Sequence, residues 1–153
     1  MNARKGQEPS APDVQLPSEG GKVAEVGTTA YVALPKAQAP EDKQLAALLQ
    51  GLTEELQRQL GPELQLLMLY GSHARGEARP DSDVDLFVVL RRASTATAEK
   101  VRQTIYQVMW DADFAYVFSL YLTDVHHYQM LQHQNSSFLR HVQQEGRVLW
   151  KAA

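Results

Sequence analysis

The sequence predicts an α/β (α+β) domain in which helices flank a small mixed β-sheet. Short apolar runs that suit buried strands alternate along the chain with segments whose apolar residues recur at helical spacing. The hydrophobic fraction of 44% is enough for a packed core, and a length of 153 residues suits one domain with a tail.

A change in composition near residue 40 separates the tail from the domain. Five of the seven prolines lie in the first 40 residues, so we expect residues 1–40 to be a flexible N-terminal arm. Within this arm, Val23–Leu34 alternates weakly and suits a short strand or hairpin. We expect the domain to occupy residues 41–150.

The first half of the domain begins with a helix over residues 41–60, because six leucines recur there at helical spacing and Gly61-Pro62 ends the pattern. Leu64–Tyr70 is a short apolar run directly before a glycine, which suits a buried strand. Residues 71–79 suit a turn with one short helical turn. Val84–Leu90 is predicted to be a second buried strand.

In the second half, apolar spacing predicts a helix over about residues 96–110, followed by a strand at Phe114–Leu122. Thr123 or Asp124 suits the cap of a further helix that runs through Leu131. The remaining elements are a helix capped by Ser136 or Ser137, which ends at Glu145-Gly146, and an edge strand at Arg147–Trp150. Six aromatic residues are expected to be mostly core: Trp110, Tyr116, Phe118, Tyr121, Phe138 and Trp150.

Composition excludes several classes of function. The chain has no cysteine, which excludes disulfides, thiolate metal sites and cysteine nucleophiles. No apolar run approaches the roughly 18–20 residues of a membrane helix, and the N-terminus lacks the apolar core of a signal peptide. With 15 basic and 18 acidic residues, the net charge is −3, so nucleic acid is not the expected partner. We expect a cytoplasmic protein.

Two acids stand at the start of the second buried strand. Asp83 and Asp85 are two positions apart, so their side chains share a face of the strand. Paired carboxylates repel each other unless a cation lies between them, and hard oxygen ligands at this spacing suit Mg²⁺. Judged alone, this pair is better explained by a polar turn of Asp81, Ser82 and Asp83 before the strand than by a metal site.

A glycine turn after the first strand adds to this pattern. Gly71 allows the backbone to turn sharply, while the Ser72 hydroxyl and the following backbone N–H groups can bind phosphate oxygens. Arg75 is a charged donor nearby. If two neighbouring strands bring the turn and the acids together, the layout suits a nucleoside triphosphate held through Mg²⁺.

The segment Gly71–Leu86, GSHARGEARPDSDVDL, resembles the G-S-x-A-R-G…S-D-x-D-L signature of the minimal nucleotidyltransferases, which belong to the DNA polymerase β-like nucleotidyltransferase superfamily. Nine positions match in order over 16 residues. The element order from about residue 41 to 150 fits that fold too, including the E-G-x-x-L-W ending at Glu145–Trp150. Residues 1–40 are not covered.

The resemblance implies transfer of a nucleoside monophosphate, AMP being expected, from an NTP to a hydroxyl acceptor. It implies that Asp83 and Asp85 are catalytic and hold Mg²⁺, two ions in a catalytic site. It also implies nucleotide binding by four residues: Gly71, Ser72, Arg75 and Ser82. For Arg75, phosphate contact and bracing of the turn by an ion pair are equally open.

One departure from the family pattern concerns a third carboxylate, which catalytic members usually carry on the next strand. By alternation, Ala115, Val117 and Ser119 share the relevant face here, and none is acidic. Asp113 falls on the same face by alternation, but it lies at the start of the strand. It supplies the third carboxylate only if the strand is displaced by about one residue pair. The alternative function is therefore a catalytically degenerate nucleotide-binding or protein-interaction module.

The resemblance also concerns partners. Minimal family members often act with a separate helical protein of the HEPN kind in toxin–antitoxin pairs, and some transfer AMP to it. The acceptor, the base preference and the oligomeric state are not readable from the sequence. A DNA or RNA binder that uses Arg75, Arg79, Arg91 and Arg92 ranks third.

Overall fold

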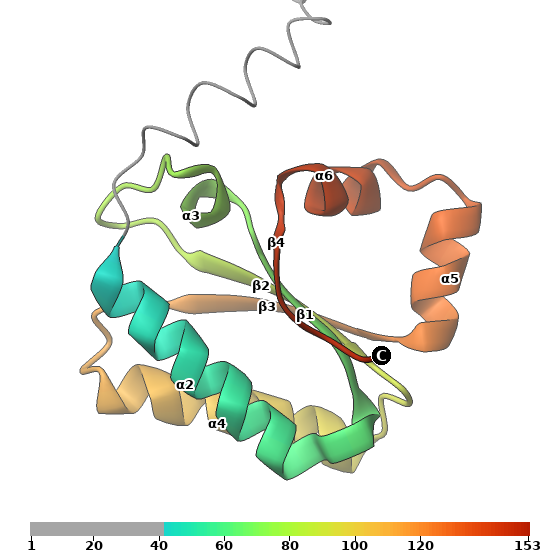
Figure 1. Ribbon diagram of the computed structural model, residues 1–153, viewed down its shortest axis with the longest axis horizontal. Helices are drawn as coiled ribbons and strands as arrows, with labels where there is room; N and C mark the ends of the chain where they lie inside the picture. The colour runs from blue at the N-terminus through green and yellow to red at the C-terminus, as the bar shows by residue number, and fades with distance from the viewer. Residues whose placement is uncertain (1–41) are drawn as a thin grey trace, which may run out of the picture. The chain divides into compact units, whose positions relative to one another are not determined.

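The computed structural model describes residues 42–153, so the predicted arm of residues 1–40 and the strand within Val23–Leu34 lie outside the described residues. The elements, in order, are α2 (Lys43–Leu60), the 3-10 turn η2 (Gly61–Glu63), β1 (Leu64–Tyr70), α3 (Ser72–Arg75), β2 (Val84–Leu90), α4 (Thr95–Asp111), β3 (Phe118–Asp124), α5 (Val125–His133), α6 (Ser137–Glu145) and β4 (Arg147–Lys151). Figure 1 shows their arrangement.

The four strands form one mixed sheet in the order β3-β2-β1-β4. β1 is antiparallel to both β2 and β4, whereas β2 and β3 are parallel. Parallel neighbours need a long crossover, which α4 provides between β2 and β3. The predicted α/β class with a small mixed sheet is confirmed.

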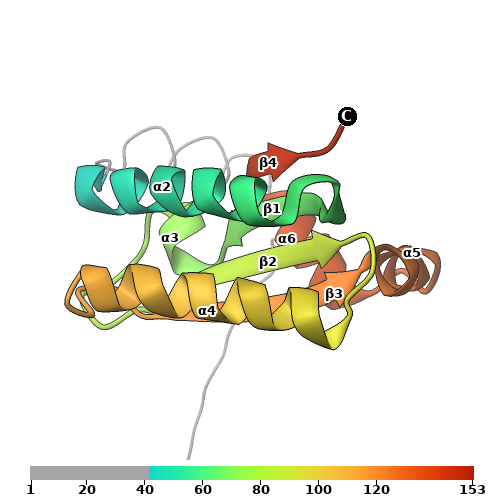
Figure 2. The same ribbon diagram turned by 90° about the horizontal axis from the view of Figure 1, so that it is seen from below.

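Helices cover both faces of the sheet, which explains why β1 and β2 are apolar along most of their length. α2 and α4 lie side by side along one face, as Figure 2 shows, and their buried side chains pack on that face. On the other face, Leu139 of α6 packs with Met68 and Phe87. Successive side chains of a strand point to opposite faces, so a strand covered on both sides is apolar throughout. Each fully buried Leu or Phe contributes about 1.5–3 kcal/mol.

Short polar side chains start each long helix. Their oxygens accept a backbone N–H three residues on, which satisfies one of the donors that a helix leaves unpaired at its start. The caps are Asp42 for α2, Ser94 for α4, Asp124 for α5 and Ser136 for α6. α2 ends at Gly61, whose φ of +52° suits glycine.

The third strand lies further along the chain than predicted. The sequence places it at Phe114–Leu122, whereas β3 spans Phe118–Asp124. The prediction is wrong at the start because Asp113 and Phe114 adopt positive φ values of 54° and 55° and form the turn that leaves α4. An unbroken apolar run gives no sign of this turn. The other helices and strands predicted within residues 42–153 are confirmed to within about two residues.

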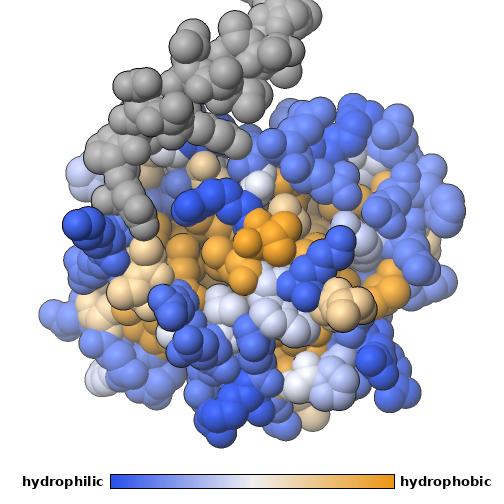
Figure 3. Space-filling model, in the orientation of Figure 1, coloured by the Kyte–Doolittle hydropathy of each residue, from blue (hydrophilic) through white to orange (hydrophobic). Residues whose placement is uncertain are grey.

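The β4 edge of the sheet is partly apolar at the surface. Val148 of β4 is 55% exposed, and Figure 3 shows hydrophobic side chains on this face between hydrophilic ones. Arg147 and Lys151 bracket the strand. Charged residues on an edge strand disfavour the addition of another strand, so the edge is protected.

Candidate functional site

The two predicted acids lie together at the start of β2. Asp85 is the second residue of β2 and is half-buried, while Asp83 lies just before the strand and is exposed. Burial raises the pKa of the Asp85 carboxyl above its ordinary value, and the charge of Asp83 raises it further. A bound cation would oppose both effects.

The glycine turn packs directly on one of these acids. Tyr70, the last residue of β1, is paired with Asp85 across the antiparallel ladder, so Gly71 reaches the carboxylate. A Cβ atom on Gly71 would lie 2.2 Å from Asp85 Oδ2, and the φ of Gly71 is +77°. The structure therefore brings the turn and the acids together, as the sequence predicts from two adjacent strands.

The residues after Gly71 form α3, a single helical turn. The N–H groups of Ala74 and Arg75 both donate to the Gly71 carbonyl, at 3.0 and 3.1 Å. Gly76 closes the turn with φ +74°. Ser72 is half-buried, and its hydroxyl has no hydrogen-bond partner within residues 42–153. Its predicted contact with phosphate stays a prediction.

Arg75 braces the turn through ion pairs. Its Nε donates to Glu77 Oε1 at 2.8 Å, and its Nη1 donates to both carboxylate oxygens of Glu145, each at 3.1 Å. The hydrogen bond to Glu77 is the largest cause of a raised pKa at Arg75, and Glu145 adds to it. Of the two roles left open by the sequence, bracing has its partners here, while phosphate contact stays a prediction.

Glu145 is a site residue that the sequence does not reveal. Besides pairing with Arg75, its Oε1 accepts the N–H of Gly71 at 3.2 Å. It lies at the end of α6, and Figure 1 shows α6 beside α3 on the same side of the sheet. The Glu145-Gly146 pair marks the end of a helix in the sequence, but nothing local signals its contact 74 residues earlier in the chain.

Ser82 closes the turn that leads into the acids. Its hydroxyl accepts the N–H of Arg79 at 2.8 Å, and its own N–H donates to the Arg79 carbonyl at 3.0 Å. The His73 ring lies with Nε2 at 3.3 Å from the Ser82 carbonyl, so α3 also contacts this turn. The hydroxyl of Ser82 thus has a structural partner, and its predicted contact with nucleotide stays a prediction.

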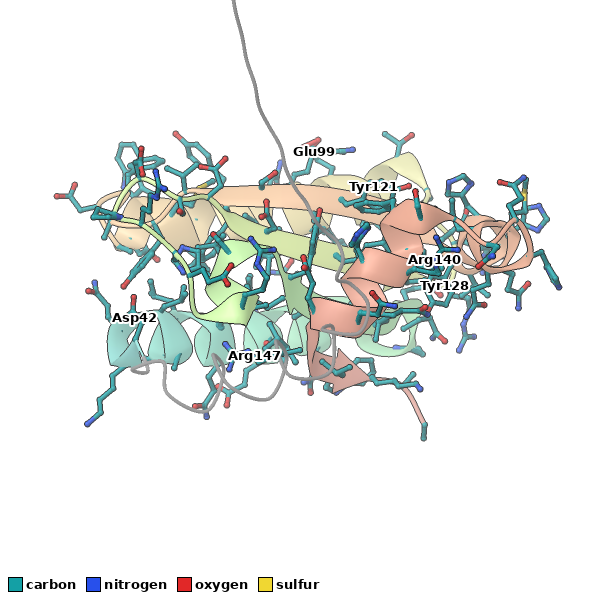
Figure 4. The ribbon with its side chains drawn as sticks, turned by 90° about the horizontal axis from the view of Figure 1, so that it is seen from above. Asp42, Glu99, Tyr121, Tyr128, Arg140 and Arg147 are labelled. Carbon is teal, nitrogen blue, oxygen red and sulfur yellow. The ribbon has the colours of Figure 1, made fainter. Side chains whose placement is uncertain are left out.

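A second contact links this region to the start of α2. The Tyr116 hydroxyl donates to Asp42 Oδ2 at 2.6 Å, and the Tyr116 ring meets the His73 ring edge-on at 6.2 Å. The bond lowers the pKa of Asp42, whereas desolvation and Asp42 raise the pKa of Tyr116 to about 12. Figure 4 shows Asp42 at one end of α2. Tyr116 is expected in the core from the sequence, and no local pattern predicts this hydrogen bond to Asp42.

The position beside the acids on β3 is occupied by a serine. In the parallel ladder, Asp85 is paired with Ser119, which is exposed, and Asp113 lies outside the strand in the turn after α4. The residue paired with Asp85 on β3 is therefore a serine, and whether another residue supplies a third carboxylate stays open. Within residues 42–153, no group of three or more His, Cys, Asp or Glu side chains is placed to hold a metal ion.

Two carboxylates nevertheless fit magnesium. Mg²⁺ keeps several waters and is commonly bound through one or two carboxylates together with substrate phosphates. Asp83 and Asp85 supply two such carboxylates, and the repulsion between them favours a cation at that place.

Aromatic side chains line the same face of the sheet next to the acids. Tyr121 follows Ser119 by two positions and therefore shares its face. Its ring stacks on Phe87 at 5.3 Å and lies 4.8 Å from Phe138. Figure 4 shows Tyr121 beside α6. These rings are half-buried or buried, which agrees with the expected core role of Tyr121 and Phe138.

The mixed sheet, with a glycine turn against an acid pair, has the layout of a nucleotidyltransferase domain. A family model described as polymerase beta, nucleotidyltransferase matches residues 50–153. The chain belongs to this family. A search of the curated proteins gives no match. None of the helices within residues 42–153 is long and apolar enough to span a membrane.

Several solved structures, including the following three, are similar to this chain. A toxin–antitoxin structure with AMP-PNP has 21% identity and a TM-score of 0.43, and the match covers 67% of this chain and 73% of that one. A candidate nucleotidyltransferase from Sulfolobus solfataricus has 17% identity, a TM-score of 0.44 and coverages of 69% and 78%. A structure of a tri-AMPylated Shewanella oneidensis HEPN toxin in complex with MNT antitoxin has 19% identity and a TM-score of 0.39. The match covers 69% of this chain and 72% of that one. The family assignment rests on the family match alone.

Proposed function

We propose that this protein is a Mg²⁺-dependent nucleotidyltransferase that transfers a nucleoside monophosphate, AMP being expected, from an NTP to a hydroxyl acceptor. The main support is the close packing of Gly71 on the Asp85 carboxylate, because a glycine turn of this kind suits phosphate and the neighbouring carboxylates suit a metal ion. Family membership supports the same reaction class.

The chain's own residues have distinct roles in this proposal. Asp83 and Asp85 would hold Mg²⁺, which would neutralise charge on the phosphate oxygens. Ser72 and the backbone after Gly71 bind the β- and γ-phosphates, and Arg75 keeps the turn in place through Glu145. The acceptor oxygen forms a bond to the α-phosphorus, the bond to pyrophosphate breaks, and the hydroxyl proton leaves to solvent.

The alternative is a nucleotide-binding or protein-interaction module without catalysis. One observation favours it, namely that Ser119 stands where a third carboxylate would complete the metal site. Both functions are compatible with a helical HEPN-type partner, an AMP-accepting one in the catalytic case. The partner and a cytoplasmic location are part of the proposal.

The first experiment measures thermal unfolding of the full chain with each of the four NTPs, with and without Mg²⁺. A ligand that binds only the folded state stabilises it by RT ln(1 + [L]/Kd), about 2.7 kcal/mol at a hundredfold excess over Kd. We expect a Mg²⁺-dependent shift that is largest with ATP and is lost in Asp83→Asn/Asp85→Asn.

Asp81→Asn is the matched control, because Asp81 is exposed in the same loop and outside the acid pair. It should keep the full Mg²⁺-dependent shift. No shift with any NTP in the wild type would overturn both nucleotide-based functions. A shift without transfer of labelled AMP to the partner protein would favour the binding module.

A further inference from the structure

An exposed aromatic cluster lies at the end of α4. Tyr106 is 53% exposed, Trp110 60%, Phe114 44% and Val117 49%. The three rings contact one another, with centroid distances of 6.3, 5.9 and 6.1 Å. We call these four residues the α4 patch. Contiguous exposed apolar surface of this kind commonly marks an interaction site.

Trp110 is expected in the core from sequence, and this prediction is wrong. α4 buries a different side, which includes Val101 and Ile105, against the sheet and α2. Figure 2 shows α4 at the surface of the molecule. Tyr106 and Trp110 are four positions apart and lie together on the exposed side of α4.

Two charges flank the patch on one side of α4. Lys100 and Asp111 are about three helical turns apart, so they point the same way from the helix, and Tyr106 lies near the middle of this span along the axis. The rings of Tyr106 and Trp110 point roughly 110° round the helix from these two charges, in the direction that the exposed Glu99 shares. Both are exposed, and no ion pair within residues 42–153 uses either. Asp111 stands at the negative end of the helix dipole, where the last turn carries no basic residue. Within residues 42–153, the only side-chain partner of Asp111 is the neutral amide of Gln107, whose Nε2 donates to Asp111 Oδ1 at 2.8 Å.

We propose that the α4 patch is a homodimer interface in which α4 packs antiparallel on α4 of a second copy. The two-fold axis passes near Tyr106, between the two α4 helices and perpendicular to both. It reverses the direction of the second helix, but side chains on one flank of the first helix stay on the same flank of the pair. Lys100 then faces Asp111 of the partner subunit, and this contact occurs twice. The same operation covers Tyr106 and Trp110 in both copies. The self-complementary charges select a second copy of this chain over a different protein.

This inference is independent of the proposed function, because neither Asp83 nor Asp85 belongs to the patch. The test is sedimentation velocity of the full chain over a roughly hundredfold concentration range. We expect a monomer–dimer equilibrium. Trp110→Ala should raise the dimer dissociation constant by about tenfold or more, as buried interface aromatics do. Met130→Ala, which trims an apolar residue of α5 that is 41% exposed, should leave the equilibrium unchanged.

Charge reversal tests the antiparallel pairing itself. Lys100→Glu and Asp111→Lys should each weaken the dimer several-fold, because each puts like charges together twice. The double variant should restore it to within about threefold of wild type. Thermal unfolding confirms that each variant is folded. A monomer at every concentration, or a double variant as weak as the singles, would overturn the proposal, as would association only with a different protein.

Discussion

Gly71 has a backbone conformation that only glycine adopts freely, with φ +77° and ψ −159°. A Cβ there would also meet Asp85 Oδ2 at 2.2 Å. We therefore expect Gly71→Ala to lower the free energy of unfolding by roughly 1–3 kcal/mol and to displace the Asp85 carboxylate. Urea unfolding measures the first effect, and loss of the Mg²⁺-dependent NTP shift measures the second.

Gly51→Ala is the control for this substitution. Gly51 lies within α2, is exposed, and has no atom within 4 Å of an added Cβ. Alanine favours a helix interior, so this variant should gain about 0.5–1 kcal/mol. If Gly71→Ala were as stable as Gly51→Ala, the close approach to Asp85 would not exist in solution.

Asp85 gives a pH dependence with a definite sign. Burial and Asp83 raise the pKa of Asp85 in the folded chain. Between the unfolded and folded pKa values the folded state holds a proton that the unfolded state has released, so stability falls as pH rises through this window. Asp85→Asn removes this loss. We expect the variant to be more stable than wild type at pH 7 and the difference to vanish below about pH 4.

Urea unfolding of wild type and Asp85→Asn at both pH values checks this expectation. Asp81→Asn controls for the loss of one surface charge and should show no such gain. A less stable Asp85→Asn at pH 7 would mean that the ionised carboxylate already has a favourable partner without metal. A stabilised variant that loses nucleotide binding would show that the acid is kept for function at a cost in stability.

The sequence predicts the acids and the glycine but not the residue that supports them. Gly71, Asp83 and Asp85 lie within one short segment, so their grouping is visible from spacing. Glu145 reaches the turn only because α6 folds back beside α3, and no local pattern encodes that contact.

At the scale of elements, the α3 turn is attached to α6 by the pair of Arg75 and Glu145. One guanidinium nitrogen contacts both carboxylate oxygens, and the side chains are only 31% and 22% exposed. A double-mutant cycle with Arg75→Ala and Glu145→Ala should therefore give a coupling free energy of about 1 kcal/mol.

Arg58 and Glu55 provide a matched exposed pair within α2, with side chains 70% and 37% exposed. Solvent screens such pairs, so the same cycle there should give a clearly smaller coupling free energy than the cycle at Arg75 and Glu145. Equal coupling in both cycles would contradict a structural role for the α3–α6 contact. Equilibrium unfolding of all the variants supplies the data.

Boundaries of elements depend on turn geometry that composition does not reveal. α4 and β3 are separated by residues 112–117, and two of them, Asp113 and Phe114, adopt left-handed conformations without being glycine. The run from Phe114 onward is apolar, so its pattern alone places the strand four residues too early. The caps at Asp124 and Ser136, by contrast, are predictable to within one residue, because short polar residues precede each helix.

At the scale of the whole domain, burial of the sheet on both faces is visible in the sequence, whereas the location of the aromatic residues is not. Apolar strands between amphipathic helices predict the layers. Trp110 is apolar but lies outside the core, because the face that α4 presents to the sheet is set by the crossover between β2 and β3. The exposed patch is therefore a property of the assembled fold.

The parallel pairing of β2 and β3 also determines which residue stands beside the acids. Asp85 and Ser119 are distant in sequence but paired in register. Ser119→Asp should therefore add a third carboxylate to the site. Without metal, the variant should be less stable than wild type because like charges are brought together. With Mg²⁺ and ATP, we expect at least a tenfold gain in apparent Mg²⁺ affinity, about 1.4 kcal/mol.

Magnesium titrations of thermal unfolding at fixed ATP measure this gain. Gln129→Asp is the control, because it adds the same charge at an exposed position of α5 and should not change the Mg²⁺ response. If Ser119→Asp also increases AMP transfer, the serine limits a working active site. If Mg²⁺ affinity stays at the wild-type value, Ser119 does not face the acid pair in solution.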